Sequence, residues 1–306
     1  IAGEDTQFVR LRALTEFGDL HLVAAGERKT HEETIPSDID LSGWTNDFNR
    51  NLLTLLGFVK PLVSSGRVVF VDANDGTDKY GDYSSIQEAI DYANGESPTE
   101  SEPYAILIRA GVYEGDIVLK PHVHLVGVSG DTSIEDRRVV IKGHITTDTP
   151  DVGDQVFLTN LYVNGVVATT EPLINKSGKG VLRLVRCHAM QSASSQGQGA
   201  TLHIDEGEVW LDHSKITAND GGLDDQFALS QSGASVLKAY RSDFIGASAL
   251  NLNPNRLPAD TVTAFFRSCE FTSTGGVNSY AVLSNSQAQF DHCLLDVHLG
   301  KAVGVN

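Results

Sequence analysis

The stretch Val209-Trp-Leu-Asp-His-Ser-Lys-Ile216 has counterparts before and after it in the chain, and their spacing decides the fold. Each counterpart joins a short apolar run, a two-residue polar bend and a second apolar run. A regular period in the range of 20 to 50 residues indicates a repeat architecture. The anchor positions Leu161, Cys187, Ser214, Ser242, Cys269 and Cys293 are 26, 27, 28, 27 and 24 residues apart.

Apolar residues alternate with polar residues within each copy, apart from the bend. In the copy quoted above, Leu211, Ser214 and Ile216 point to one side if the chain bends between Leu211 and Ser214. A two-residue period is typical of a strand with one buried face. A further short apolar segment precedes each copy, with no room for a crossover helix. We therefore expect an all-β fold, a parallel β-helix of about eight coils in residues 67–306.

The anchor position holds all three cysteines of the chain. Neighbouring coils stack about 4.8 Å apart, so we expect this position to form an internal ladder of small side chains. Parallel stacked side chains give poor disulfide geometry, and three cysteines in 306 residues do not make a disulfide framework. We expect core packing here, and predict no metal site and no cofactor. The ladder residues are Cys187, Ser214, Ser242, Cys269 and Cys293.

The composition restricts the classes of partner. The formal net charge is −17, which argues against binding to nucleic acid or to an anionic membrane surface. No apolar run approaches the roughly 20 residues that a membrane-spanning helix needs. We therefore expect neither a nucleic-acid partner nor a membrane partner.

Residues 1–66 do not carry the repeat, and we expect them to form an N-terminal arm. Within 39–63, large apolar residues recur at helical spacing, which predicts one helix with an apolar stripe. We interpret this stripe as a docking surface for another chain. Its residues are Trp44, Phe48, Leu52 and Leu55.

The β-helix is expected to begin at Arg67, with a first strand up to Asp72. The sequence Ser85-Ile-Gln-Glu88 then forms a capping box that opens a short amphipathic helix. A solenoid needs its open end covered. We expect this helix to be the N-terminal cap.

Four segments in this region resemble those of a known superfamily. They are Val69-Phe-Val-Asp-Ala-Asn-Asp-Gly76, Ser84-Ser-Ile-Gln-Glu-Ala-Ile-Asp91, Ile106-Leu-Ile-Arg-Ala-Gly-Val-Tyr-Glu114 and Ile117-Val-Leu-Lys-Pro-His-Val-His-Leu-Val-Gly127. Together they look like the start of a pectin-lyase-like β-helix, with pectin methylesterases nearest in pattern. The resemblance covers about residues 67–295 and implies a right-handed coil.

The same resemblance suggests a candidate nucleophile, Asp243, within Arg241-Ser-Asp-Phe-Ile-Gly246. The family's Gln-Asp-Thr-Leu-like and Arg-Pro-Trp-like segments are missing from the chain. Apart from the resemblance, adjacent coils of a β-helix bring outward side chains close enough for paired-carboxylate chemistry. If the chain is an enzyme, its candidate catalytic residues are Asp243, Asp212, Arg241 and Arg267.

Without a complete catalytic constellation, we expect a non-catalytic structural or attachment module. β-Helices with small N-terminal arms resemble virion proteins, including bacteriophage tailspikes and head or tail appendages. This layout implies a decoration or tail protein on a virion surface, or otherwise an extracellular protein. Its partners would be other protein chains, including copies of itself in a homo-oligomer. The alternative is a polysaccharide-acting enzyme (an esterase, lyase or hydrolase) or a β-helix that binds a surface glycan without turnover.

Overall fold

The computed structural model describes a series of ranges between residues 9 and 304. These are 9–12, 21–24, 67–73, 82–128, 139–147, 149–166, 171–192, 200–218, 227–252, 262–275, 279–284, 287–297 and 301–304. Within the expected arm, β1 (Val9–Arg12) and β2 (His21–Ala24) form a two-stranded antiparallel sheet. The predicted docking stripe of Trp44, Phe48, Leu52 and Leu55 lies outside the described residues.

The rest of the described chain forms three parallel sheets, which it visits in turn as it coils. Sheet 1 contains β3 (Val68–Val71), β4 (Tyr104–Ile108), β7 (Val123–Gly127), β10 (Gln155–Thr159), β13 (Val181–Val185), β16 (Gly207–Asp212), β19 (Ser235–Tyr240), β22 (Val262–Arg267) and β25 (Gln287–Asp291). Sheet 2 contains β5 (Gly111–Glu114), β8 (Val139–Lys142), β11 (Leu161–Val166), β14 (His188–Ser192), β17 (Lys215–Ala218), β20 (Asp243–Gly246), β23 (Glu270–Ser273) and β26 (Leu294–Val297). Sheet 3 contains β6 (Ile117–Leu119), β9 (Ile145–Thr147), β12 (Ile174–Lys176), β15 (Ala200–Ile204), β18 (Phe227–Gln231), β21 (Ser248–Leu252), β24 (Tyr280–Ser284) and β27 (Lys301–Gly304).

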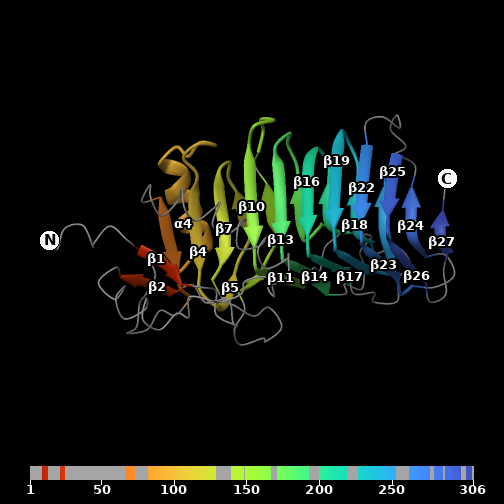
Figure 1. Ribbon diagram of the computed structural model, residues 1–306, viewed down its shortest axis with the longest axis horizontal. Coiled ribbons are helices and arrows are strands. Elements are labelled where there is room, and N and C mark those ends of the chain that lie inside the picture. The colour runs from red at the N-terminus through yellow and green to blue at the C-terminus, as the bar shows by residue number, and fades with distance from the viewer. Residues whose placement is uncertain are drawn as a thin grey trace, which may run out of the picture.

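This arrangement is a parallel β-solenoid, as the repeat predicts. Figure 1 shows its strands stacked side by side along the long axis of the view, in sequence order from left to right. Each strand pairs with the equivalent strand of the next coil, so every side chain has a partner at the same position one coil away.

The solenoid has about five regular turns, so the expectation of about eight coils is wrong. In sheet 1, the strands before β10 pair at unequal steps: Val69 with Ile106, Ile106 with Leu125, and Leu125 with Leu158. Long and short connections alternate in this N-terminal part. Because the steps are unequal, the sequence shows no regular period there. From Leu158 onward, the inward column passes to Leu184, Leu211, Ala239, Phe266 and Phe290 in steps of 26, 27, 28, 27 and 24 residues.

The interior is filled by columns of apolar side chains, one set from each sheet. Sheet 3 contributes an aliphatic column that includes Ile145, Ile174 and Leu202, all fully buried. Near the C-terminal end the columns become aromatic. Phe271 lies 5.1 Å from Phe244 in a stacked geometry and 5.1 Å from Phe266 edge to face, measured between ring centroids. Aromatic pairs of this kind add to the free energy of burial.

The predicted short helix is present as α4 (Ile86–Gly95), the one helix in the described ranges. The Ser85 hydroxyl accepts a hydrogen bond from the Glu88 backbone N–H at 3.4 Å, as an N-cap does. Its apolar side packs against β3 and β4. The buried residues are Ile86, Ala89, Ile90 and Ala93.

Polar side chains replace apolar ones at several interior positions of sheet 3, among them Lys176 and Gln231. Lys176 is fully buried, and its Nζ donates to the carbonyl oxygens of Ser177 at 3.0 Å and Glu206 at 3.2 Å. Burial lowers the pKa of Lys176 to about 8. Gln231, also fully buried, donates from Nε2 to the carbonyl of Ser235 at 3.1 Å. Both residues therefore satisfy backbone carbonyls where sheet 3 turns toward sheet 1.

The aromatic end of the core gives a stability test. The Phe271→Ala variant should lower the free energy of unfolding by about 3–5 kcal/mol, because it removes a fully buried ring and leaves a cavity. Urea unfolding followed by circular dichroism measures this change. The Phe70→Ala variant is the control, because that ring is 45% exposed and should cost much less. Equal losses in the two variants would contradict the assignment of Phe271 to the core.

Candidate functional site

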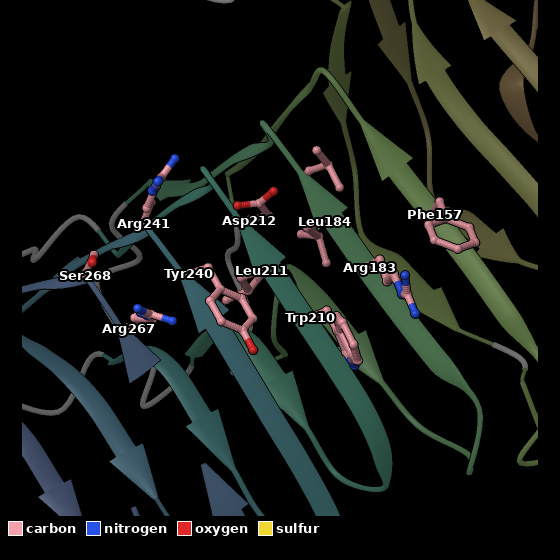
Figure 2. A pocket seen from close by; sticks show the side chains of 11 residues that line it. Phe157, Arg183, Leu184, Trp210, Leu211, Asp212, Tyr240, Arg241, Arg267 and Ser268 are labelled. Carbon is pink, nitrogen blue, oxygen red and sulfur yellow. The ribbon is translucent and has the colours of Figure 1, made fainter. Parts of the chain in front are cut away.

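A groove of about 520 Å³ lies on the outer face of sheet 1. It crosses β10, β13, β16, β19 and β22, so five neighbouring coils contribute to it. Figure 2 shows its polar and aromatic side chains standing on the outer surface of consecutive strands. The lining residues are Phe157, Arg183, Leu184, Val185, Trp210, Leu211, Asp212, Tyr240, Arg241, Arg267 and Ser268.

One outward column of the groove alternates aromatic and cationic side chains. The register places Phe157, Arg183, Trp210 and Lys238 on successive strands at the same position. The Arg183 guanidinium carbon lies 5.1 Å from the Phe157 ring centroid and 4.2 Å from that of Trp210. The Lys238 Nζ lies 4.6 Å from the Trp210 centroid. These are cation–π distances, and we call these four residues the cation–aromatic column.

Glu208 fixes one end of this column. Its Oε1 accepts hydrogen bonds from Trp210 Nε1 and from Lys238 Nζ. Lys238 therefore has a carboxylate partner within the column. Arg183 differs, because its Nε is buried and has no hydrogen-bond partner. Burial lowers the pKa of Arg183, while the Glu208 charge acts in the opposite direction.

The neighbouring column holds the charged candidates. Asp212 Oδ1 lies 2.9 Å from His213 Nδ1, and His213 Nε2 lies 3.5 Å from Arg241 Nη1. The Arg267 guanidinium makes an ion pair with Asp291 at 3.3 Å. These contacts form two groups along the rim of the groove, one of Asp212, His213 and Arg241 and one of Arg267 and Asp291.

The bend between sheet 1 and sheet 2 sets the position of this rim. From Asn160 onward, its second residue has a left-handed backbone conformation in six successive turns, with φ between 47° and 55°. The backbone N–H of that residue donates to a carbonyl of the next coil, for example Arg186 to Asp212 at 2.9 Å. Side chains at the bend are thereby held outward at one corner. The residues are Asn160, Arg186, His213, Arg241, Ser268 and His292.

The structure brings together three of the four catalytic candidates. Asp212, Arg241 and Arg267 line the groove, whereas Asp243 begins β20 in sheet 2 and is not a lining residue. Asp212 is the one carboxylate among the lining residues. Glycoside hydrolysis needs two carboxylates about 5–9 Å apart, and the lining does not supply that pair. In the described part of the chain, no group of three or more His, Cys, Asp or Glu side chains is arranged to hold a metal ion.

The residues that the sequence analysis missed are the four of the cation–aromatic column. Their signal lies three residues before the bend, at Phe157, Arg183, Trp210, Lys238 and Phe265. Aligning the copies shows that aromatic and cationic residues alternate there. The candidate residues predicted from sequence lie at or next to the polar bend instead, because the bend contains acidic and basic side chains.

The predicted ladder lies at the corner between sheets 1 and 2, with four of its five residues buried and Cys293 half-buried. The Cys187 backbone N–H donates to Ser214 Oγ at 3.1 Å, and that of Ser214 donates to Ser242 Oγ at 3.2 Å. The Ser214 hydroxyl in turn donates to the Leu184 carbonyl at 3.1 Å. The three cysteines are free thiols.

Thiol labelling tests this placement. Burial raises the pKa of Cys187 to about 12 and that of Cys269 to about 11. Since the thiolate is the reactive form, native protein at pH 8 should label at Cys293 long before the other two. Mass spectrometry of labelled peptides identifies the site, and labelling in denaturant should reach all three. Fast native labelling of Cys187 would show that the ladder is not closed.

A buried histidine continues the cation–aromatic column toward the N-terminus. His124 lies 4.5 Å from Phe157, centroid to centroid, and its Nδ1 accepts a hydrogen bond from the Phe157 backbone N–H at 3.3 Å. Burial lowers the pKa of His124 to about 3, and the nearby His122 acts in the same direction. The folded state therefore holds this side chain neutral.

This histidine predicts a pH dependence of stability. Its folded pKa lies below the unfolded value of 6.5, so its contribution is complete above pH 6.5 and is lost as the pH falls toward 3. We expect about 2 kcal/mol of unfolding free energy to disappear between pH 7 and pH 4.5 through this group. Urea titrations at both pH values measure it. The His124→Asn variant, which keeps an acceptor, should lose less, whereas the exposed His292→Asn control should behave as wild type.

The chain matches no known family model and no curated protein sequence. Among the described residues, no helix has the length and hydropathy required to cross a bilayer.

Proposed function

We propose that this chain is a non-catalytic structural and attachment module of a virion surface, a capsid decoration or tail appendage. Residues 1–66 would dock it to the particle through the apolar stripe that contains Trp44 and Leu55. The solenoid would project or cover a surface and present sheet 1 to a further protein chain. This combination of an N-terminal arm and a β-helix is the layout that such virion proteins resemble.

The composition of the groove is the observation that carries the proposal. Three arginines and one carboxylate stand among its lining residues, so it is equipped to bind rather than to perform paired-carboxylate chemistry. Asp212 contacts His213, and Arg267 contacts Asp291. Each candidate catalytic group on the rim thus already has a protein partner.

The finer architecture belongs to the same proposal. Parallel strand connections are almost always right-handed, which supports a right-handed coil of the pectin-lyase-like type. The buried side of α4 packs on the first strands of sheet 1. This packing supports the role of the helix as the N-terminal cap.

The function is tested by looking for turnover and for assembly with the full chain. The wild-type chain is incubated with pectin and with bacterial capsular polysaccharide. It should release no more reducing ends or methanol than the double variant Asp212→Asn/Asp243→Asn releases. Light scattering should give a mass that is a multiple of the chain mass. Replacing Trp44 and Leu55 with serine should lower that mass, while replacing Val152, which is 74% exposed, should leave it unchanged.

Two results would count against the proposal. Product release by the wild-type chain that the double variant lacks would make the chain an enzyme. A wild-type chain that stays monomeric and associates with no larger particle would remove the case for a virion component.

A further inference from the structure

The groove on sheet 1 is positively charged in a strongly acidic chain. The whole chain carries a net charge of −17. The lining of the groove includes three arginines, Arg183, Arg241 and Arg267, and a single carboxylate, Asp212. An acidic partner is repelled by most of such a surface and attracted to this part of it. The groove therefore favours a partner segment of negative charge and determines where on the protein that segment binds.

Arg183 is the member of the groove best prepared to bind an anion. Its guanidinium is held between the rings of Phe157 and Trp210, at 5.1 and 4.2 Å from their centroids. Its Nε is buried without a hydrogen-bond partner, and leaving such a donor unsatisfied is costly. A carboxylate is the usual acceptor for the planar donor fork of arginine.

The aromatic rings of the cation–aromatic column are not free to stack on a sugar. Trp210 has Arg183 and Lys238 over its ring, and Phe157 has Arg183 over its own. These cations lie where a sugar or a base would have to pack. The column thus offers hydrogen-bond donors and charge rather than apolar faces, which favours a peptide over a glycan or a nucleic acid.

The spacing of the arginines fits an extended chain that runs along the solenoid axis. Arg183 stands on β13 and Arg267 on β22, which are separated by β16 and β19. Three steps of about 4.8 Å, with an offset of two residues along the strands, put the two arginine positions about 16 Å apart. In an extended peptide, residues four apart point to the same side and are about 13 Å apart, and the long arginine side chains span the difference.

We propose that the sheet 1 groove docks an extended acidic segment of a partner protein, with carboxylates four residues apart that bind Arg183 and Arg267. The inference rests on the proposed attachment function and names the chemistry of the partner. The Arg267 side chain is 67% exposed and its ion pair with Asp291 lies at the surface, so a partner carboxylate replaces Asp291 at little cost. Arg183 lines the other end of the groove, where its guanidinium binds the second carboxylate.

Fluorescence anisotropy with the full chain tests this. The probe is a labelled peptide with two aspartates four positions apart in a glycine–serine background, and its matched control has asparagines instead. The aspartate peptide should bind, and more weakly at high salt. Arg183→Gln and Arg267→Gln should each weaken binding about ten-fold. Arg183→Lys should fall between, because it keeps the charge and loses the planar fork.

Lys142→Gln is the matched control variant, because it removes one positive charge from sheet 2, outside the groove. It should bind the peptide as wild type does. Circular dichroism reports folding of every variant. If Arg183→Gln does not fold, Arg267→Gln still tests the proposal. The Arg267 side chain is mostly exposed, so this substitution should not disturb folding.

Four outcomes of the binding measurements would overturn the assignment. They are failure of the aspartate peptide to bind, equal binding of the asparagine peptide, binding that neither arginine variant weakens, and preference for polygalacturonate over the peptide. Dissociation of a homo-oligomer by Arg183→Gln would also overturn it, because a second copy would then occupy the groove. Peptide binding and product release are measured separately. The peptide-docking proposal can therefore be wrong while the chain is still non-catalytic.

Discussion

Hydrogen bonding between parallel strands of successive coils is the constraint on which the rest of this structure depends. It holds neighbouring coils at the spacing of paired strands, about 4.8 Å, and fixes them in register. Every side chain therefore stacks on the side chain one repeat earlier. Inward positions become continuous columns such as Leu158, Leu184 and Leu211. Outward positions become columns too, and this is how residues about 27 apart in sequence form one groove.

At the corner between sheets 1 and 2, the pairing of successive coils holds residues in an unfavourable backbone conformation. A left-handed conformation is uncommon for residues other than glycine, asparagine and aspartate, yet Arg186, His213 and Arg241 all adopt it. The hydrogen bond from each of these residues to the next coil compensates for the local cost. The corner is consequently sharp, and the side chains that follow it enter the interior ladder through Cys187 and its serine neighbours.

The sequence predicts the features that follow from the repeat, namely the parallel coils and their shared corner. The spacing of Cys187, Ser214 and Cys269 was enough to predict parallel coils and a shared corner, because one register applies to all of them. The N-terminal coils follow unequal steps, so the period could not give their number. Nor could it reveal that Lys176 lies inside, since its burial depends on carbonyl groups that only the folded corner provides.

The cation–aromatic column shows how a stacked fold gathers charge of one sign without strong repulsion. Two cations on adjacent coils would stand about 4.8 Å apart, close enough to destabilise each other. Here Trp210 separates Arg183 from Lys238 and interacts with both cations. The two charges are then two coils apart, near the screening length of about 10 Å at moderate ionic strength. The aromatic spacer thus lets the face carry positive charge, while Glu208 pairs with Lys238 and Arg183 lines the groove.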